Sequence, residues 1–280
     1  MRWVVAVVAV GLLAAGCGDG GGTADGADAA TSTSTTSAST TVAPADSEPI
    51  LGEELVGRWA HYDVVAYEDG VLKTLIISYG FNDFTVVDGE VIDSARFCFS
   101  EQRTDQPIET SLSDAATQAI RPPSTPVEVD LVDGVLRVRR AATPTPVGIR
   151  LDDPFTESLP TDPDDPRIVD DDGDGNPGIT VSIRVTDELS GELYIARREI
   201  FAWEALLTGP DTLTGTVTDD SEQLIIGASD PIFAAESSWV QHPDPAKSPI
   251  ILERVTDDWD CARLAEERDA LFPPTPDVDW

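Results

Sequence analysis

The chain has 280 residues, of which 52 are acidic and 18 are basic, so its formal net charge is -34 at pH 7. Such a charge repels nucleic acid and anionic lipid headgroups and attracts cations, which argues against a phosphate-binding role. Hydrophobic residues make up 41% of the chain, enough for a sizeable core in one globular domain over residues 49–272.

The first residues are typical of the targeting segment of an exported protein. Arg2 precedes an apolar run over 3–13, and small residues then lead to Cys17. The run is too short to span a bilayer, which takes about 20 apolar residues. The ending at 14–17 resembles the lipobox of bacterial lipoproteins, although Ala14 stands where leucine is commonest. The resemblance implies a signal peptide over 1–16, lipidation (palmitate) at Cys17, and attachment to the bacterial membrane at its periplasmic face or at the cell surface.

A low-complexity segment follows Cys17. Residues 18–48 are mostly Gly, Ala, Asp, Ser and Thr and show no hydrophobic periodicity. Such a segment cannot bury enough area to offset its ordering entropy, so we expect 17–48 to be a disordered linker with a reach of roughly 30 Å. Its Ser/Thr run could be glycosylated or simply flexible.

Turn signals predict the class of the folded part. Asp-Gly pairs at 69–70, 88–89 and 133–134 lie between apolar or alternating runs. Asp-Gly suits a type I′ hairpin turn, which needs positive φ at both central residues. Ser190-Gly191 predicts a fourth hairpin turn. We therefore expect an all-β domain, mostly an antiparallel barrel or sandwich.

The remaining elements are sparser. Further strands are expected at 179–185, 213–217, 224–226 and 250–255. Prolines and aspartates over 144–166 predict a long loop that frames 147–151. One helix is expected over 258–271, with Asp257 as its N-cap and one apolar face docked on the sheet. Pro273-Pro274 ends it, and we expect 273–280 to be a disordered tail.

Gly57-Arg58-Trp59 begins the first strand and resembles the Gly-x-Trp signature of lipocalin and related calycin barrels. The resemblance implies that Trp59 closes one end of a barrel and that an arginine near the last strand, here Arg254, packs over it. The folded region is longer than a lipocalin, and the middle lipocalin motifs are not evident. A buried tryptophan at the start of an ordinary β-sandwich therefore stays open.

Three cysteines occur in the chain. If Cys17 carries lipid, Cys98 and Cys261 are left as an even pair in an oxidising compartment. A disulfide between them would close most of the folded region into one loop and stabilise it by roughly 5 kcal/mol in the chain-entropy model. It would also bring the predicted helix to the sheet. The alternative is a pair of buried free thiols.

The most specific internal motif is the acidic run from Asp170 to Gly178. Asp170, Asp172 and Asp174 stand at positions 1, 3 and 5, glycine follows at 6, and Asn176 would offer its backbone carbonyl at 7. The run resembles the aspartate-rich Ca²⁺ loops of EF-hand, dockerin, thrombospondin-type and integrin-like modules.

This resemblance has gaps. Position 9 is Gly178 and position 12 is Val181, so the shell needs help from Asp164, Asp165 or Asp171, or from water. We expect a structural Ca²⁺ ion, and an acidic turn without an ion is the alternative.

Signatures of catalysis are missing. The only two histidines, His61 and His242, lie far apart, and each is expected at the surface or in a turn. Phe97 and Phe99 share one predicted strand face with Cys98 on the other, and core packing explains them better than a ligand cavity. Carboxylates are so abundant that any pair suited to glycoside hydrolysis would arise by chance.

These observations favour a non-enzymatic, membrane-anchored extracytoplasmic lipoprotein. Its β domain would bind a ligand or partner, such as a small apolar ligand, a glycan or an envelope protein. The alternatives are a carbohydrate-active hydrolase that uses paired carboxylates and a structural or adhesive envelope protein. A cavity inside the fold would favour the ligand-binding hypothesis, and a filled core with a flat surface would favour the structural or adhesive protein.

Overall fold

The computed structural model describes residues 50–68, 70, 72–234 and 239–280, which belong to one compact unit. The predicted signal peptide, Cys17 and the linker lie outside the described residues. The strands are β1 (Gly57–Glu68), β2 (Lys73–Val87), β3 (Glu90–Thr104), β4 (Glu109–Leu112), β5 (Thr125–Pro126), β6 (Glu128–Val132), β7 (Val135–Val147), β8 (Ile179–Arg184), β9 (Ser190–Gly209), β10 (Thr212–Asp219), β11 (Glu222–Ala228), β12 (Val240–Gln241) and β13 (Pro249–Val255). The helices are α1 (Asp114–Ala119) and α2 (Cys261–Leu271), with 3₁₀ turns η1 (Glu53–Leu55), η2 (Pro231–Phe233) and η3 (Pro245–Lys247).

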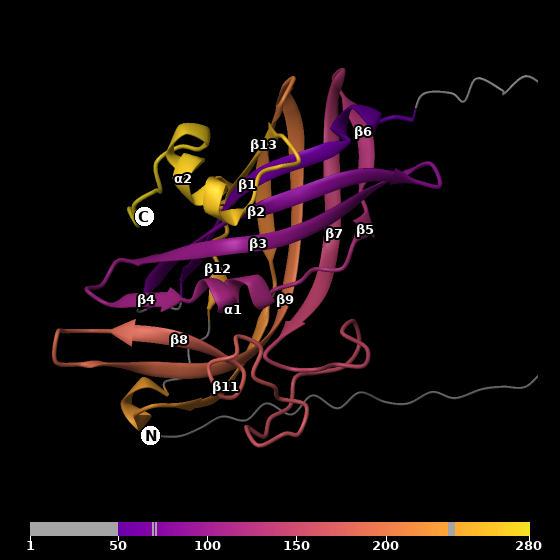
Figure 1. Ribbon diagram of the computed structural model, residues 1–280. Helices are drawn as coiled ribbons and strands as arrows, with labels where there is room; N and C mark the ends of the chain where they lie inside the picture. Colours follow the sequence, from indigo (N-terminus) through magenta and orange to yellow (C-terminus); the bar gives the residue numbers. More distant parts are fainter. Residues whose placement is uncertain (1–49, 69, 71, 235–238) are drawn as a thin grey trace, which may run out of the picture. The chain divides into compact units, whose positions relative to one another are not determined.

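The strands form one strongly curled antiparallel sheet. Nine of them follow the path β4-β8-β9-β10-β13-β1-β2-β3-β5, and β6, β7, β11 and β12 branch from it. In Figure 1, β1, β2 and β3 run in a different direction from β7 and β13, which shows how far the sheet bends. β4, at one end of the path, also lies beside β3, where Thr110 Oγ1 donates a 2.5 Å hydrogen bond to Gln102 Oε1. The prediction of a mostly antiparallel β domain with a C-terminal helix is confirmed, and the sheet is a half-barrel.

The Asp-Gly pairs turn where they are predicted to turn. Asp88 and Gly89 join β2 to β3 with φ of 53° and 88°, and Asp133 and Gly134 join β6 to β7 with φ of 52° and 82°. β1 and β2 also pair as a hairpin, although the aspartate of that turn lies outside the described residues. Positive φ at both turn positions matches the right-handed twist of the flanking strands.

The predicted turn at Ser190-Gly191 is wrong in its position. β8 and β9 do form a hairpin, but Arg184 already pairs with Ser190, and the turn lies at 185–189. Gly191 is part of β9, where a Cβ atom would lie 2.2 Å from the ring of Phe233. This glycine therefore serves the close approach of an aromatic ring and makes no turn.

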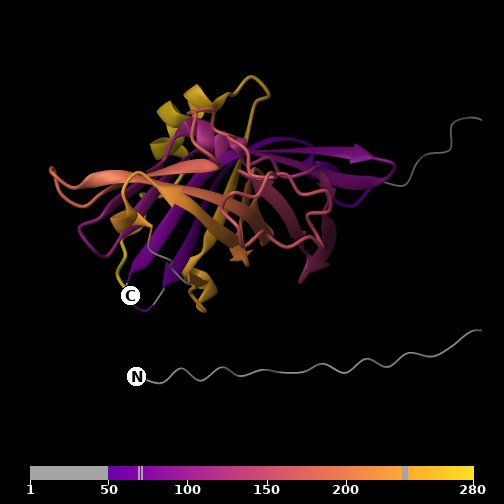
Figure 2. The ribbon, with the colours of Figure 1, turned by 90° about the horizontal axis from the view of Figure 1, so that it is seen from below.

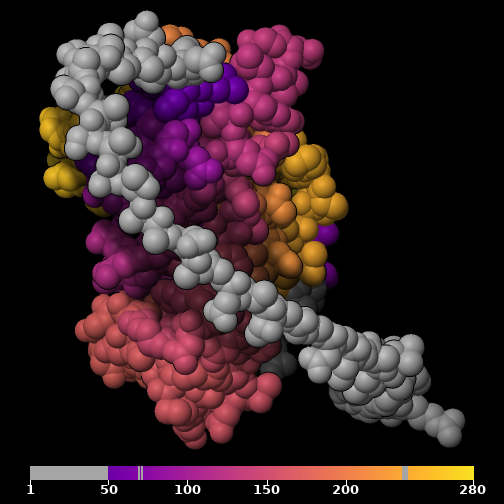
Figure 3. All heavy atoms as spheres, turned by 90° about the vertical axis from the view of Figure 1, so that its right-hand side faces the viewer, coloured from indigo at the N-terminus to yellow at the C-terminus, as the bar shows by residue number. Residues whose placement is uncertain are grey.

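The predicted loop over 144–166 begins later than expected. β7 runs on to Val147 and pairs with β9 through Pro144 and Pro146. Proline has no N–H group to donate to a neighbouring strand. Among the described residues, no strand pairs with the edge of β7 that faces away from β9 beyond Arg139, so the two prolines interrupt no hydrogen-bond ladder there. The loop proper follows Val147 and returns at β8, and its salmon atoms lie at the lower end of the face shown in Figure 3.

Helix α2 begins three residues later than predicted. Its N-cap is Asp260, whose Oδ1 accepts a 2.9 Å hydrogen bond from the backbone N–H of Arg263. The expected cap, Asp257, instead offers its backbone carbonyl to Arg58. The predicted disulfide is present and joins Cys98 of β3 to Cys261, the first residue of α2. Figures 1 and 2 show α2 on the outer side of β1–β3.

β1 is buried on both faces. Its even-numbered side chains, such as Tyr62 and Val64, pack with Leu264 of α2 and with Phe272. Its odd-numbered side chains point to the inside of the half-barrel, where Trp59 belongs to the main core. Period-two alternation therefore assigns one face of β1 to the helix and the other to the interior.

A β-bulge separates Phe97 from Phe99. Tyr79 pairs with Phe99 and the next residue, Gly80, pairs with Phe97, so β3 carries one extra residue at this point. Phe99 and Cys98 pack in the cluster under α2, whereas Phe97 faces the interior. The prediction that the two phenylalanines share one face is therefore wrong.

The contact that the calycin resemblance implies is present. The Cζ atom of Arg254 lies 4.2 Å from the ring centroid of Trp59. Arg254 also donates hydrogen bonds to the backbone carbonyls of Glu54 and Val56, and Trp59 Nε1 donates to that of Leu55. Through these hydrogen bonds and its cation–π contact with Trp59, Arg254 holds the η1 turn against the core.

The residues after α2 have no regular structure but contact the domain. Lys247 Nζ lies 3.0 Å from Asp279 Oδ1, and the ring of His242 lies 5.4 Å from that of Trp280. Within the described ranges, no helix is long and apolar enough to cross a membrane.

Candidate functional site

The curled sheet encloses a cavity of about 550 Å³. Its wall is built by side chains from β1–β4, α1, β7–β11 and η2, so both directions of the bent sheet contribute. Most of the wall is aliphatic or aromatic, and Val181, Ile183 and Ile195 are typical members. Clefts of this size and character are typical of small-molecule sites.

The inner face of β9 changes from apolar to charged along the strand. Leu193 and Ile195 line the cavity first, Arg197 and Glu199 follow on the same face, and Phe201 ends the series. Because alternate residues of a strand share a face, the charged pair forms a single polar wall inside an apolar cavity. The sequence analysis did not predict this polar wall.

The charges of this wall are paired with neighbours. Arg197 Nε lies 2.7 Å from Glu199 Oε1, and Tyr67 donates a 2.7 Å hydrogen bond to Asp219 Oδ2. Ser221 Oγ lies within hydrogen-bond distance of Glu199 Oε2 and of Asp219 Oδ1, at 2.9 and 2.5 Å. Arg197, Glu199 and Asp219 therefore form a connected network, and none of the three lacks a partner.

His61 and Asp63 behave differently. Both are buried in β1, with 3% and 1% of their surface exposed, and Asp63 lines the cavity. His61 Nε2 and Asp63 Oδ2 lie 3.8 Å apart, and neither atom has a hydrogen-bond partner. Burial raises the pKa of Asp63 well above its ordinary value, and the charges of Asp219 and Glu199 raise it further.

The protonation of His61 follows from its other ring nitrogen. Asn82 Nδ2 donates to both oxygens of Asp93 at 2.9 Å, so Asn82 Oδ1 faces His61 Nδ1 at 2.8 Å and accepts a hydrogen bond from its N–H group. The proton is thus on Nδ1, and Nε2 carries a lone pair. Burial lowers the pKa of His61 to about 4, which keeps the ring neutral.

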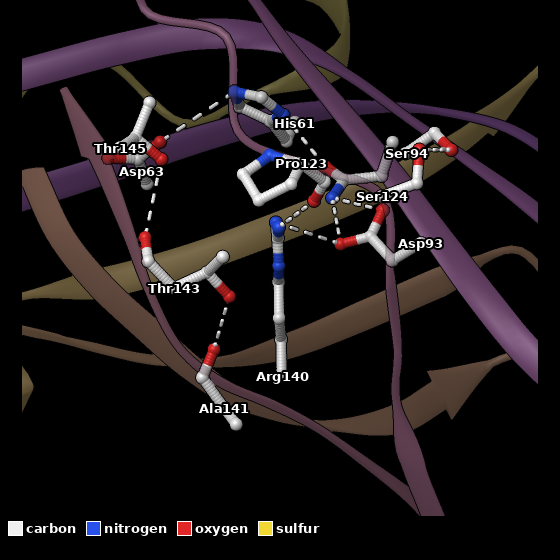
Figure 4. Close-up of polar contacts among 11 residues, drawn as sticks. His61, Asp63, Asp93, Ser94, Pro123, Ser124, Arg140, Ala141, Thr143 and Thr145 are labelled. Atoms are coloured by element: carbon white, nitrogen blue, oxygen red, sulfur yellow. Dashed lines mark hydrogen bonds and ion pairs between the residues drawn. The ribbon is translucent and has the colours of Figure 1, made fainter. Parts of the chain in front are cut away.

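The far end of this chain of hydrogen bonds is an ion pair. Arg140 Nη1 lies 3.4 Å from Asp93 Oδ2, and Arg140 Nη2 donates to the carbonyl of Pro123 at 2.9 Å (Figure 4). Burial raises the pKa of Asp93 to about 6, although Arg140 and Asn82 oppose that rise. The chain from Asp93 to His61 holds the ring in place behind Asp63.

Gly80 makes room for the imidazole. A Cβ atom at this position would lie 2.1 Å from the carbonyl oxygen of Arg96 and 2.6 Å from Cε1 of His61. The ring thus occupies the space beside a glycine of the neighbouring strand.

The prediction that His61 lies at the surface or in a turn is wrong, because β1 is covered by α2 on one side and by the half-barrel on the other. His242 does lie in a turn, where its Nδ1 accepts a 3.1 Å hydrogen bond from Asp244 N. Asp63 was not singled out from the sequence. The sequence did contain a sign of its role, because Asp63 is a charged residue in a mostly apolar strand and lies two residues from His61, on the same face.

The three aspartates of the acidic loop do converge. Oxygens of Asp170, Asp172 and Asp174 all lie within 4.8 Å of one another, so these residues could hold a metal ion. Asp172 Oδ1 is buried without a hydrogen-bond partner, and such an orphaned oxygen fits a cation ligand. Burial raises the pKa of Asp172, and the charges of Asp174 and Asp170 add to that effect.

Other oxygens of the loop already have partners. Asp170 accepts from the N–H groups of Gly173 and Gly175, at 2.7 and 2.9 Å. Asn176 donates to Asp174 through its backbone N–H, at 2.8 Å, and through its side chain, at 3.2 Å.

Two of the residues expected to complete the shell are engaged elsewhere. Asp171 pairs with Arg150, at 2.5 Å, and Asp165 pairs with Arg167, at 2.9 Å. Asp164 does not belong to the converging group, so the metal-ligating oxygens beyond the three aspartates would be those of backbone carbonyls or water.

No protein-family model matches this chain, and comparisons with curated proteins and with solved structures find no match either.

The buried imidazole leads to a prediction about pH. Since His61 has a pKa of about 4 in the native state and about 6.5 when unfolded, the unfolded chain binds more protons between these values. The contribution of His61 to the free energy of unfolding therefore falls as the pH falls from about 6.5, by up to about 3 kcal/mol. Asp93, with its raised pKa, acts in the opposite direction over part of this range.

Nitrogen-15 NMR of the imidazoles tests this directly, because Nε2 of His61 should keep the shift of an unprotonated nitrogen near pH 5. The His61→Gln variant should lose less stability than the wild type when the pH falls from about 7 to about 5. Titration of His61 near its ordinary pKa of about 6.5 would contradict the assignment.

Proposed function

We propose that this protein is a non-enzymatic, lipid-anchored extracytoplasmic protein whose β domain binds a small amphipathic molecule. The cavity is the single observation that carries the proposal, since a filled core would leave no space for a ligand. At about 550 Å³, it lies within the range of roughly 300–1,000 Å³ that is typical of ligand pockets. Its apolar wall suits an apolar ligand body, and its polar wall suits one head group.

The competing hydrolase hypothesis has less support. Asp63, Glu199 and Asp219 do line one cavity, as paired-carboxylate chemistry requires. However, Glu199 is paired with Arg197, and Asp219 accepts from Tyr67 and Ser221. The predominantly apolar wall also offers few partners for the many hydroxyl groups of a glycan.

The location outside the cytoplasm rests on two features. The lipobox-like ending at Cys17 supplies the membrane attachment, and the disulfide between Cys98 and Cys261 is typical of an oxidising compartment. The strongly negative charge makes nucleic acid an unsuitable partner.

We further propose that the acidic loop binds a structural Ca²⁺ ion. The ligands would be carboxylate oxygens of Asp170, Asp172 and Asp174 and the backbone carbonyl of Asn176. The ion would neutralise three converging carboxylates and fix the loop before β8.

The cavity proposal predicts that blocking the cavity abolishes binding. Ile183→Trp adds bulk on the inner face of β8 and should weaken the binding of an apolar fluorescent probe by more than about tenfold. Ser182→Trp is the matched control, because its exposed side chain points to the other face of the same strand. Equal probe affinities in the two variants, each checked for an unchanged circular dichroism spectrum, would count against the cavity as the site.

The calcium proposal predicts a rise in the melting temperature with millimolar Ca²⁺, because the ion binds the folded chain. Asp172→Ala combined with Asp174→Ala should remove the rise. Asp187→Ala, which removes an exposed carboxylate from the turn between β8 and β9, should keep it. A wild-type melting curve that does not respond to Ca²⁺ would show that the loop is an acidic turn.

The anchoring proposal predicts that Cys17→Ala releases the protein from membranes. Radiolabelled palmitate should enter the wild type and not the variant. A variant that stays in the membrane fraction, together with an unlabelled wild type, would refute lipidation at Cys17.

A further inference from the structure

Two buried atoms, one in the cavity wall and one behind it, lack a hydrogen-bond partner. His61 Nε2 carries a lone pair because the ring proton is on Nδ1, which donates a hydrogen bond to Asn82 Oδ1, and Asp63 Oδ2 is a carboxyl oxygen. They lie 3.8 Å apart, less than twice the length of an ordinary hydrogen bond of about 2.9 Å. One donor atom placed between them could therefore reach both after a small shift.

Asp63 also has no cationic partner among the described residues. Arg140 is paired with Asp93, and Arg197 is paired with Glu199. A buried carboxyl group without a cation is unusual, because buried charges in proteins are paired or bound to metals. The negative groups near it increase the local demand for a positive charge.

We propose that His61 and Asp63 recognise the primary ammonium group of an amphipathic amine whose apolar part fills the rest of the cavity. This inference rests on the proposed ligand-binding function and names the head group that the cavity selects. Asp63 would supply the counter-charge, and His61 would accept a second N–H bond.

Other head groups satisfy the pair less well. A hydroxyl group carries no charge, so it forms no ion pair with Asp63 and gives the carboxyl group no reason to release its proton. A carboxylate only accepts hydrogen bonds, and it would enter a wall that already holds Glu199 and Asp219. An ammonium group offers three donors and a positive charge.

The charges and protons of this binding step balance. Burial raises the pKa of Asp63 well above its ordinary value, which favours the protonated carboxyl group in the empty cavity. The amine arrives from solution as R–NH₃⁺, Asp63 releases its proton to the solvent, and an ion pair forms. Each molecule of amine bound near pH 7 should therefore release about one proton. The other titratable or charged groups that line the cavity are Tyr67 on β1, Arg140 on β7, Arg197 and Glu199 on β9, and Asp219 on β10, with His61 and Asp93 behind the wall.

The test compares three ligands with the same chain, namely decylamine, decan-1-ol and decanoate, by isothermal titration calorimetry of the full-length protein. Wild type should bind the amine more than about tenfold more tightly than the alcohol, and decanoate most weakly. Repeating the amine titration in two buffers of different ionisation enthalpy should reveal the release of about one proton.

Two variants locate the effect. Asp63→Asn keeps the shape of the side chain, and it should lose the preference for the amine and the proton release while still binding decan-1-ol. Asp269→Asn, the same substitution at an exposed position of α2 on the outer side of the sheet, should behave as the wild type does.

The outcomes separate this inference from the function on which it rests. If the alcohol and the amine bind equally and no proton is released, the cavity binds ligands but the amine inference is wrong. If none of the three ligands binds, the proposed function itself fails. If Asp63→Asn does not fold, the proton release measured with the wild type still tests the amine inference. Amine binding without proton release would overturn the proposal.

Discussion

The burial of β1 on both faces is the constraint on which the cavity depends. Alternate side chains such as Tyr62 pack under α2, and the disulfide between Cys98 and Cys261 fixes the start of that helix on β3. The opposite face, which carries Asp63, is thereby held toward the interior of the curled sheet. Without the helix, the outer apolar face would be exposed to water, and the strand would have no reason to keep its inner face buried.

Keeping polar groups inside this half-barrel costs stability. Each unpartnered buried polar atom costs on the order of 1–3 kcal/mol, and both His61 Nε2 and Asp63 Oδ2 belong to this class. The network behind them, from Asn82 to Asp93 and Arg140, is by contrast well connected. An unsatisfied pair held in place by a hydrogen-bonded network is the kind of local violation of packing rules that occurs at functional sites.

Apart from the disulfide between Cys98 and Cys261, which followed from the number of cysteines, and the contact between Arg254 and Trp59, the features predicted correctly from the sequence are local ones. Asp88-Gly89 and Asp133-Gly134 encode their turns in two adjacent residues, and the acidic loop brings its aspartates together within a few residues. The turn predicted at Ser190-Gly191 was wrong because the role of Gly191 depends on Phe233, which is distant in sequence. The cavity could not be predicted for the same reason, since Asp63, Glu199 and Asp219 come from three strands that meet only when the sheet curls.

The acidic loop and the cavity wall are mechanically connected. Asp172 Oδ2 accepts a 2.9 Å hydrogen bond from the N–H of Thr180, the second residue of β8. Gly178, just before that strand, lies so close to β9 that a Cβ atom would be 2.2 Å from the carbonyl oxygen of Ile195. Ile195 itself lines the cavity. A cation that ordered the three aspartates would therefore stiffen the β8–β9 wall, so the loop can influence ligand binding without contacting the ligand.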